Sequence, residues 1–154
     1  MEMSSNGMYV LTGEETNKLT LWQEGTKVWD KGGFLNGLYG IDISSDGSNI
    51  TAVDRRNVYF FDKGSNSEVW NENFATQEMS TVTISPDGRY IAAGTFDGNV
   101  YVFLTSDKDD VWYHSDALDG KITDISFSGD SSHLIIGTES GRVHVYSSEG
   151  GDPM

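Results

Sequence analysis

The chain of 154 residues contains no cysteine and only two prolines. Without cysteine it forms no disulfide, no zinc–thiolate site and no thiol nucleophile, although this absence does not fix the compartment. No charged-then-apolar leader occurs, and no apolar run approaches the length of about 18 residues that a membrane helix needs. We therefore expect neither a signal peptide nor a transmembrane helix in the chain as given, and we favour a soluble, cytoplasmic protein.

Basic residues are also scarce. Ten lysines and arginines face 24 aspartates and glutamates, so the formal net charge is −14. Such a charge disfavours binding to nucleic acid or to an anionic membrane, because both attract cationic surfaces. It is typical of a solvated acidic surface, and it would also suit a high-salt cytoplasm in which screening makes the charge tolerable.

What the chain does contain is glycine, 18 residues of it, together with 12% aromatic residues. This composition fits a turn-rich all-β protein and not a disordered or collagen-like one. The length predicts one domain, and a domain of this size buries about two-thirds of its unfolded surface.

The segment Thr81–Trp112 reads as four consecutive strands. Alternation in its first residues predicts a strand with unlike faces, and the turn residues of Ser85–Gly88 follow it. The short apolar run from Tyr90 to Gly94 predicts a strand buried on both faces. A hairpin at Asp97-Gly98 then leads to a strand rich in β-branched and aromatic residues, and a polar loop leads to the last one.

The same pattern recurs along the chain with a period of about 41 residues. The first turn of each unit begins at Ser4, Ser44, Ser85 and Ser128, at spacings of 40, 41 and 43 positions. The last strand of three units contains a Val-Trp pair, at Val28-Trp29, Val69-Trp70 and Val111-Trp112. Two independent sets of positions that keep one period indicate a true repeat.

Four-stranded units of about 40 residues are typical of β-propeller blades. The sequence therefore predicts an all-β fold, a propeller of about four four-stranded antiparallel blades that forms a partial or half ring. We place the blades at about 1–35, 36–76, 77–118 and 119–154 within one repeat domain, 1–154. The first unit keeps only Met1-Glu2-Met3 of its opening strand, and the last ends at Pro153-Met154 before any Val-Trp strand.

The repeat resembles WD40-like and quinoprotein-like (PQQ-like) β-propellers, and it is similar to propeller repeat proteins of archaea. The resemblance rests on the turn Ser85–Gly88 and on the segment Tyr90–Phe103. Its quinoprotein-like part rests on the eight-residue spacing from Asp62 to Trp70, from which Leu104 departs in the next unit. The repeat of this chain also departs from a true WD repeat, because Trp29-Asp30 falls in the fourth strand and no Gly-His pair occurs. The resemblance implies an architecture, and it gives only a prior for function.

No catalytic, cofactor-binding or metal-binding set is evident. Four blades supply no recognisable quinone site, and the vicinal cysteines of quinoprotein dehydrogenases are absent. The Asp-Gly turns lack the ligand series of a calcium loop. His114, His133 and His144 lack a metal-ligand spacing, and we expect His144 to project from the face of its strand opposite to its valine neighbours. We expect no enzyme activity and no cofactor.

Other recurrent residues are interpreted as structural. We expect the three recurrent tryptophans to pack between blades and Trp22 to fill the core position taken elsewhere by Phe61, Phe103 and Tyr146. The structural repeat anchors are Trp29, Trp70, Trp112, Gly47, Gly88, Asp87, Asp97 and Gly98. Arg55 and Arg56 form the one adjacent basic pair, and we interpret them as a surface ion pair or a contact point.

An open arc of four blades exposes a blade face at each end, and neither end looks more polar than the centre. Three arrangements would cover these faces: closure of the four blades on themselves, a longer protein of which the chain is half, or two chains joined head to tail into eight blades. The last is our hypothesis.

We expect a non-enzymatic scaffold for a protein partner or for itself. One alternative is a propeller that binds or converts a carbohydrate or small metabolite in its channel, and another is an engineered or excised fragment without activity. The predicted channel residues are Tyr39, Asp42, Ser80, Thr83, Thr123 and Ser126, which lean away from acid–base catalysis because most are small and neutral.

Overall fold

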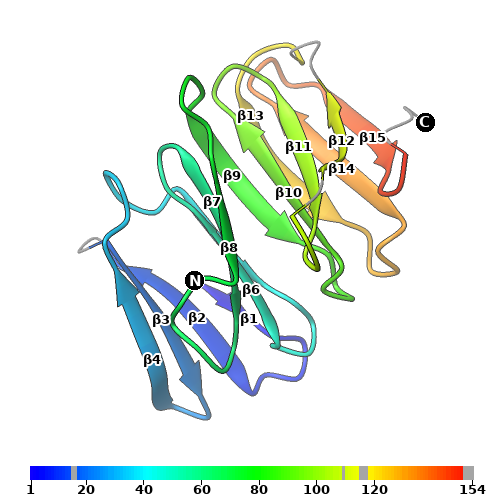
Figure 1. The fold of residues 1–154 in the computed structure, drawn as a ribbon. Helices are drawn as coiled ribbons and strands as arrows, with labels where there is room; N and C mark the ends of the chain where they lie inside the picture. Colours follow the sequence, from blue (N-terminus) through cyan, green and yellow to red (C-terminus); the bar gives the residue numbers. More distant parts are fainter. Residues whose placement is uncertain (15–16, 109, 115–117, 151–154) are drawn as a thin grey trace.

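The structure is a computed structural model, and it describes residues 1–14, 17–108, 110–114 and 118–150. Four antiparallel sheets follow one another along the chain (Figure 1). The first sheet consists of β1 (Glu2–Met3), β2 (Tyr9–Glu14), β3 (Lys18–Gln23) and β4 (Thr26–Gly32). The second consists of β5 (Gly40–Ile43), β6 (Asn49–Val53), β7 (Asn57–Asp62) and β8 (Trp70–Asn73).

The third sheet consists of β9 (Met79–Ile84), β10 (Tyr90–Thr95), β11 (Val100–Leu104) and β12 (Asp110–His114), and the fourth of β13 (Ile122–Phe127), β14 (His133–Thr138) and β15 (Val143–Ser147). In each sheet, strands that follow one another in the chain pair side by side. Within the described ranges, the fourth sheet has three strands, and β1 of the first has two residues. No helix in these ranges has the length and apolar character that a membrane span requires.

One Ser-centred turn joins the first two strands of every sheet. In the third sheet the Ser85 hydroxyl donates to Asp87 Oδ1 at 2.6 Å and accepts the Tyr90 N–H at 2.9 Å. The Asp87 carboxylate also accepts the Arg89 N–H at 3.0 Å. The serine and aspartate side chains thus satisfy the backbone groups of the turn. The turns at Ser4, Ser44 and Ser128 repeat these contacts.

A hydrophobic cluster fills each space between neighbouring sheets. Between the first and second sheets, Leu21 packs with Ile50 and Phe61. The other two spaces are filled in the same way, and the side chains of β10 are buried along its whole length because this strand lies between two neighbours. The sheets thus stack face to face, and Figure 1 shows the first and the last at opposite ends of the stack. This arrangement confirms the predicted all-β propeller architecture.

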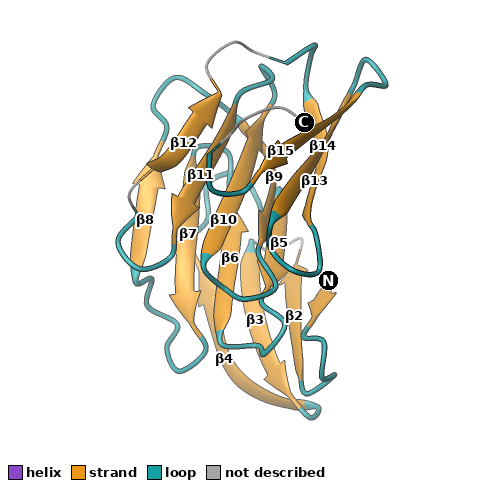
Figure 2. Cartoon of the chain, turned by 90° about the vertical axis from the view of Figure 1, so that its right-hand side faces the viewer, coloured by secondary structure: helices purple, strands orange, loops and turns teal. Residues whose placement is uncertain are grey.

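The first strands of neighbouring sheets contact one another: β1 contacts β5, β5 contacts β9, and β9 contacts β13. Figure 2 shows the stack from the side of the fourth sheet, with β13 beside β9 and β5. The first strands therefore form one continuous edge of the stack, as the innermost strands of a propeller do. Side chains and loops on this edge come from all four repeats.

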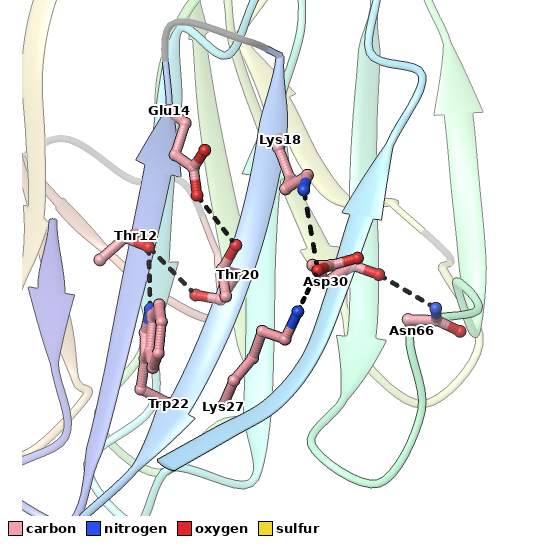
Figure 3. Close-up of polar contacts among 8 residues, drawn as sticks. All are labelled: Thr12, Glu14, Lys18, Thr20, Trp22, Lys27, Asp30 and Asn66. Carbon is pink, nitrogen blue, oxygen red and sulfur yellow. Dashed lines mark hydrogen bonds and ion pairs between the residues drawn. The ribbon is translucent and has the colours of Figure 1, made fainter. Parts of the chain in front are cut away.

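The outer face of the first sheet differs from the sequence prediction. Trp22 has the register of Phe61 and Phe103 but is only half-buried, because no sheet covers it, so its placement in a core slot was wrong. Its indole N–H donates to Thr12 Oγ1 at 3.1 Å, and the Thr20 hydroxyl donates to Glu14 at 3.3 Å (Figure 3). This end is more polar than its sequence suggested.

Candidate functional site

A groove of about 840 Å³ runs along the edge formed by the first strands. The second, third and fourth sheets each contribute residues of their first strand, which are β5, β9 and β13. The first sheet contributes residues at the start of β1 and at the end of β2. The segment Asn36–Tyr39, which leads into β5, closes one side. A groove to which every repeat contributes is a candidate site for a partner.

The ionisable side chains that line the groove are all acidic. Four carboxylates line it, those of Glu2, Glu14, Asp42 and Asp124. The lining residues include no lysine, arginine or histidine in the part of the chain that the structure describes. The groove therefore concentrates the negative potential of a chain whose formal charge is −14.

Asp42 is fixed by hydrogen bonds between two sheets. Its Oδ2 accepts the Thr83 hydroxyl at 2.7 Å and the Ile84 N–H at 2.8 Å, while Oδ1 accepts its own neighbour's N–H, that of Ile43, at 2.7 Å. Burial nevertheless raises the pKa of Asp42, against the opposite effect of these bonds. Burial and then the charge of Asp42 raise the pKa of Glu2. Asp42 is thus a structural carboxylate that joins β5 to β9.

The predicted channel residues are partly borne out. Tyr39, Asp42, Thr83 and Ser126 line the groove. Ser80 instead donates its hydroxyl to the Ile122 carbonyl at 2.7 Å, and Thr123 is exposed.

The six predicted residues left out three carboxylates of the lining, those of Glu2, Glu14 and Asp124. Asp124 could have been found, since it lies in the same predicted strand as Ser126. Glu2 could not, because the two-residue β1 gave no strand pattern to place it, and Glu14 could not, because it ends β2 next to a hairpin.

An exposed aromatic pair stands at the Tyr39 end of the groove. The rings of Tyr39 and Phe96 meet edge to face with centroids 6.0 Å apart, and both side chains are more than one-third exposed. The Lys121 ammonium lies 4.3 Å from the centroid of the Phe96 ring. Exposed aromatic rings next to a charged groove are a common feature of surfaces that bind proteins.

The three recurrent tryptophans reach from one sheet to the next. The indole N–H of Trp29 donates to the Lys63 carbonyl at 2.9 Å, that of Trp70 to Thr105 at 3.0 Å, and that of Trp112 to Ser148 at 3.1 Å. Each acceptor lies just after the third strand of the following sheet. The structure thus places these residues between sheets and away from the groove.

The glycine positions among the repeat anchors have positive φ. Gly47 and Gly88 have φ of 77° and 75°, and an added Cβ at Gly88 would collide with the Asn49 side chain. In the fourth unit Ser131 adopts the same conformation at the equivalent position, with φ of 63°, and its hydroxyl accepts the Asp87 N–H at 3.2 Å. Gly98, after Asp97 in the β10–β11 hairpin, has φ of 87°.

The basic pair lies in the β6–β7 hairpin. Arg55 forms an ion pair with Glu78, which bridges the second and third units, and Arg56 is exposed. The neighbouring Asp54 is fully buried and accepts the N–H groups of Arg56 and Asn57, each at 2.9 Å. The hairpin is therefore ordered by Asp54.

The described histidine side chains contact different partners. His133 contacts the Ser132 hydroxyl at 2.6 Å, whereas His144 stacks on Tyr146 with centroids 6.4 Å apart. The side chain of His114 and the terminal Pro153-Met154 lie outside the described residues. Among the residues that are described, no group of three or more histidines, aspartates and glutamates is arranged to hold a metal ion.

Comparison with known proteins agrees with this geometry. Residues 84–154 match the WD40 domain of anaphase-promoting complex subunit 4. Autophagy-related protein 16 of Arabidopsis thaliana is 29% identical over an alignment of 111 residues, and the match covers 68% of this chain and 22% of that protein. An uncharacterized WD repeat-containing protein of Schizosaccharomyces pombe is 26% identical over 92 residues, 60% of this chain and 16% of that protein.

A chain in the crystal structure of the mitotic checkpoint complex has the same fold, with a TM-score of 0.83 at 13% identity, covering 98% of this chain and 48% of that one. The chain spans less than a quarter of the length of the two sequence relatives. Fold and groove thus define a β-propeller. The matches to a WD40 domain and to a WD repeat-containing protein support a WD40 propeller.

Proposed function

We propose that this chain is a non-enzymatic scaffold that binds a protein partner through its acidic groove. The fold supports this role, because propellers present loops and strand edges on a rigid frame. Two of the similar proteins are named for assemblies, the anaphase-promoting complex and the mitotic checkpoint complex. The relation to quinoprotein-like and archaeal propellers remains a prediction from sequence.

The partner segment is basic. The observation that carries this is the groove lined by four carboxylates without a lysine, arginine or histidine among its described lining residues. A lysine- or arginine-bearing segment in the groove would be attracted by this potential, and the partly exposed rings of Tyr39 and Phe96 offer contact area to its apolar side chains.

The alternative of a catalytic channel is disfavoured by how Asp42 is held. General acid–base catalysis needs a carboxylate that can reach a substrate proton. Both oxygens of Asp42 instead accept protein hydrogen bonds, from Thr83, Ile84 and Ile43. The observed contacts therefore support a binding role over a catalytic one.

A peptide titration tests the scaffold proposal. A fluorescein-labelled peptide of repeated Lys-Ala-Ala should bind at low salt, and the matched Glu-Ala-Ala peptide should not. Asp124→Asn should weaken binding about two- to fivefold, because one exposed charge contributes below about 1 kcal/mol. Glu24→Gln removes a charge from a turn outside the groove lining and serves as the control. Equal weakening by both variants would mean that only net charge matters and would refute a groove site.

We further propose that a second copy completes the ring, giving eight sheets. This proposal is supported by the stack itself, whose first and fourth sheets lie at opposite ends (Figure 1). The expected mass in light scattering is twice the 16.9 kDa of one chain. A mass of one chain at micromolar concentration would rule out self-association and leave the groove proposal intact.

A further inference from the structure

Each of the three joints between neighbouring sheets uses the same register positions. At the third joint, Ala92, Val100 and Val102 of the third sheet pack against the fourth sheet. The side of the fourth sheet that they meet includes Leu134 and Tyr146. One joint thus has two halves, a leading half on the second and third strands and a receiving half on the first three strands of the next sheet.

The fourth sheet carries a leading half with no sheet on it. Strand pairing places Ile135, Val143 and Val145 at the positions of Ala92, Val100 and Val102. The three residues of the third sheet are fully buried, whereas Ile135 is 44% exposed and Val143 is 69% exposed. Three β-branched aliphatic residues on neighbouring strands form the apolar surface that buries against a sheet elsewhere in this chain.

The first sheet carries the matching receiving half. Met3, Val10 and Trp22 stand at the positions of Phe127, Leu134 and Tyr146. Met3 is 62% exposed. The polar groups on this face already have partners in their own sheet, since the Trp22 N–H donates to Thr12 and the Thr20 hydroxyl to Glu14 (Figure 3). Burial of the face would therefore leave no donor among them unpaired.

We infer that the leading half of the fourth sheet binds the receiving half of the first sheet of a second copy, head to tail, with Val143 and Met3 inside the joint. This inference rests on the proposed self-association and specifies its geometry. The occupant is a second copy because the one chain carries both complementary halves. Two such joints close the ring, so the contact is heterologous and still forms a finite assembly.

The joint also completes the groove. Glu2, Asp42, Thr83 and Ser126 occupy equivalent positions in the four first strands. Asp42 accepts the Thr83 hydroxyl of the next sheet at 2.7 Å, so neighbouring members of this set are in contact. The joint sets Ser126 of one copy beside Glu2 of the other, again a hydroxyl next to a carboxylate. Each groove is incomplete until the second copy supplies its other side.

The net charge of each copy determines how dimerisation should depend on salt. Each copy carries a formal charge of −14, so two copies repel each other in dilute buffer. Salt screens this repulsion, because the Debye length falls from about 30 Å at 0.01 M to about 3 Å at 1 M. The dimer should therefore tighten as salt is added, by about tenfold between these limits, whereas binding of the basic peptide should weaken.

Two variants damage one half each. Val143→Asp places a carboxylate in the leading half, and Met3→Asp places one in the receiving half; both sites are exposed in the single chain, so each variant should fold. Each variant alone should dissociate about a hundredfold more readily, because an unpaired charge would be buried in both joints. Val69→Asp is the matched control, since Val69 is 56% exposed and lies outside both halves.

Mixing the two variants decides the geometry. A Met3→Asp copy keeps its leading half and a Val143→Asp copy keeps its receiving half, so the mixture has one undamaged joint and should recover dimer in light scattering. If wild type is monomeric, self-association fails and this inference fails with it. If wild type is dimeric but the mixture recovers nothing, or if Met3→Asp stays dimeric, the head-to-tail joint is wrong while self-association stands.

Discussion

The joined positions of this chain and their equivalents at the two open ends carry different chemistry. In the joints the register positions hold aromatic and aliphatic side chains such as Phe61 and Val102, which are fully buried. At the first sheet the same face holds Trp22 and Thr12, hydrogen-bonded to each other, and at the fourth sheet it holds exposed aliphatic residues. One repeat pattern thus produces a core, a polar face or an apolar surface, depending on what lies against it.

The largest contrast is expected between Phe61 and Trp22, which share one register position. Phe61→Ala should lower the free energy of unfolding by about 3–5 kcal/mol, because it leaves a cavity in a closed joint. Trp22→Ala should lower it by about 1 kcal/mol, because the ring is only partly buried, lies under no other sheet and makes one hydrogen bond. Urea unfolding of the monomer measures both values, and a loss for Trp22→Ala as large as that for Phe61→Ala would show that the outer face is already closed.

The second contrast compares the stability effects of Asp42 and Glu2, which lie in the first strands of their sheets. Asp42→Ala should cost about 2 kcal/mol, because it leaves the Thr83 hydroxyl and the Ile84 and Ile43 N–H groups without their acceptor. Glu2→Ala is the control, and it should cost less than about 0.5 kcal/mol because β1 is a short, exposed edge.

The stability difference between wild type and Asp42→Ala depends on pH with a definite sign. Burial raises the pKa of Asp42 above its unfolded value, so ionisation of this carboxyl costs stability in the fold. The stability that Asp42 contributes is therefore largest below the unfolded pKa and declines as the pH rises through the folded pKa. The free energies of unfolding of wild type and variant, measured in urea, should therefore become more similar over that pH range. A difference that widens would contradict the assigned pKa direction.

A third contrast separates the two kinds of tryptophan. Trp29→Phe removes the hydrogen bond to the Lys63 carbonyl of the next sheet and should cost about 1–1.5 kcal/mol, since that acceptor loses a buried partner. Trp22→Phe removes a bond at an open face, where water can replace it, and should cost about 0.5 kcal/mol or less. Thermal unfolding followed by circular dichroism distinguishes them, and equal losses would remove the distinction between joint and end.

The sequence was sufficient for the repeat and the sheet order, because Ser-x-Asp turns and Val-Trp strands recur at one period. It was insufficient for the groove, because Glu2 lies in a two-residue strand and Glu14 beside a hairpin, where no periodicity places a side chain. The core position predicted for Trp22 was wrong, because a register position predicts which face of the sheet a residue occupies. It does not predict whether a neighbouring sheet covers that face. Asp54 was missed as a buried acid because a polar residue in a hairpin is normally exposed.

The smallest contrast lies in the Ser-centred turns of the two end sheets. Asp130 in the fourth unit and Asn6 in the first occupy equivalent positions, and both accept a serine hydroxyl, at 2.6 Å from Ser128 and 2.8 Å from Ser4. Hydrogen bonds from the Ser128 hydroxyl, and then from the hydroxyl and N–H of Ser132, lower the pKa of Asp130 below its unfolded value.

The stability that Asp130 contributes is therefore fully present above the unfolded pKa of about 4 and is lost as the pH falls through the lower folded pKa. Asp130→Asn should make the fold slightly less stable at neutral pH, because a neutral acceptor forms weaker bonds, and the deficit should shrink as the pH falls below the unfolded pKa. Asn6→Asp should transfer the acid sensitivity to the first sheet. A deficit for Asp130→Asn that stays constant with pH in urea unfolding would mean that the turn is held by its geometry and not by the carboxylate charge.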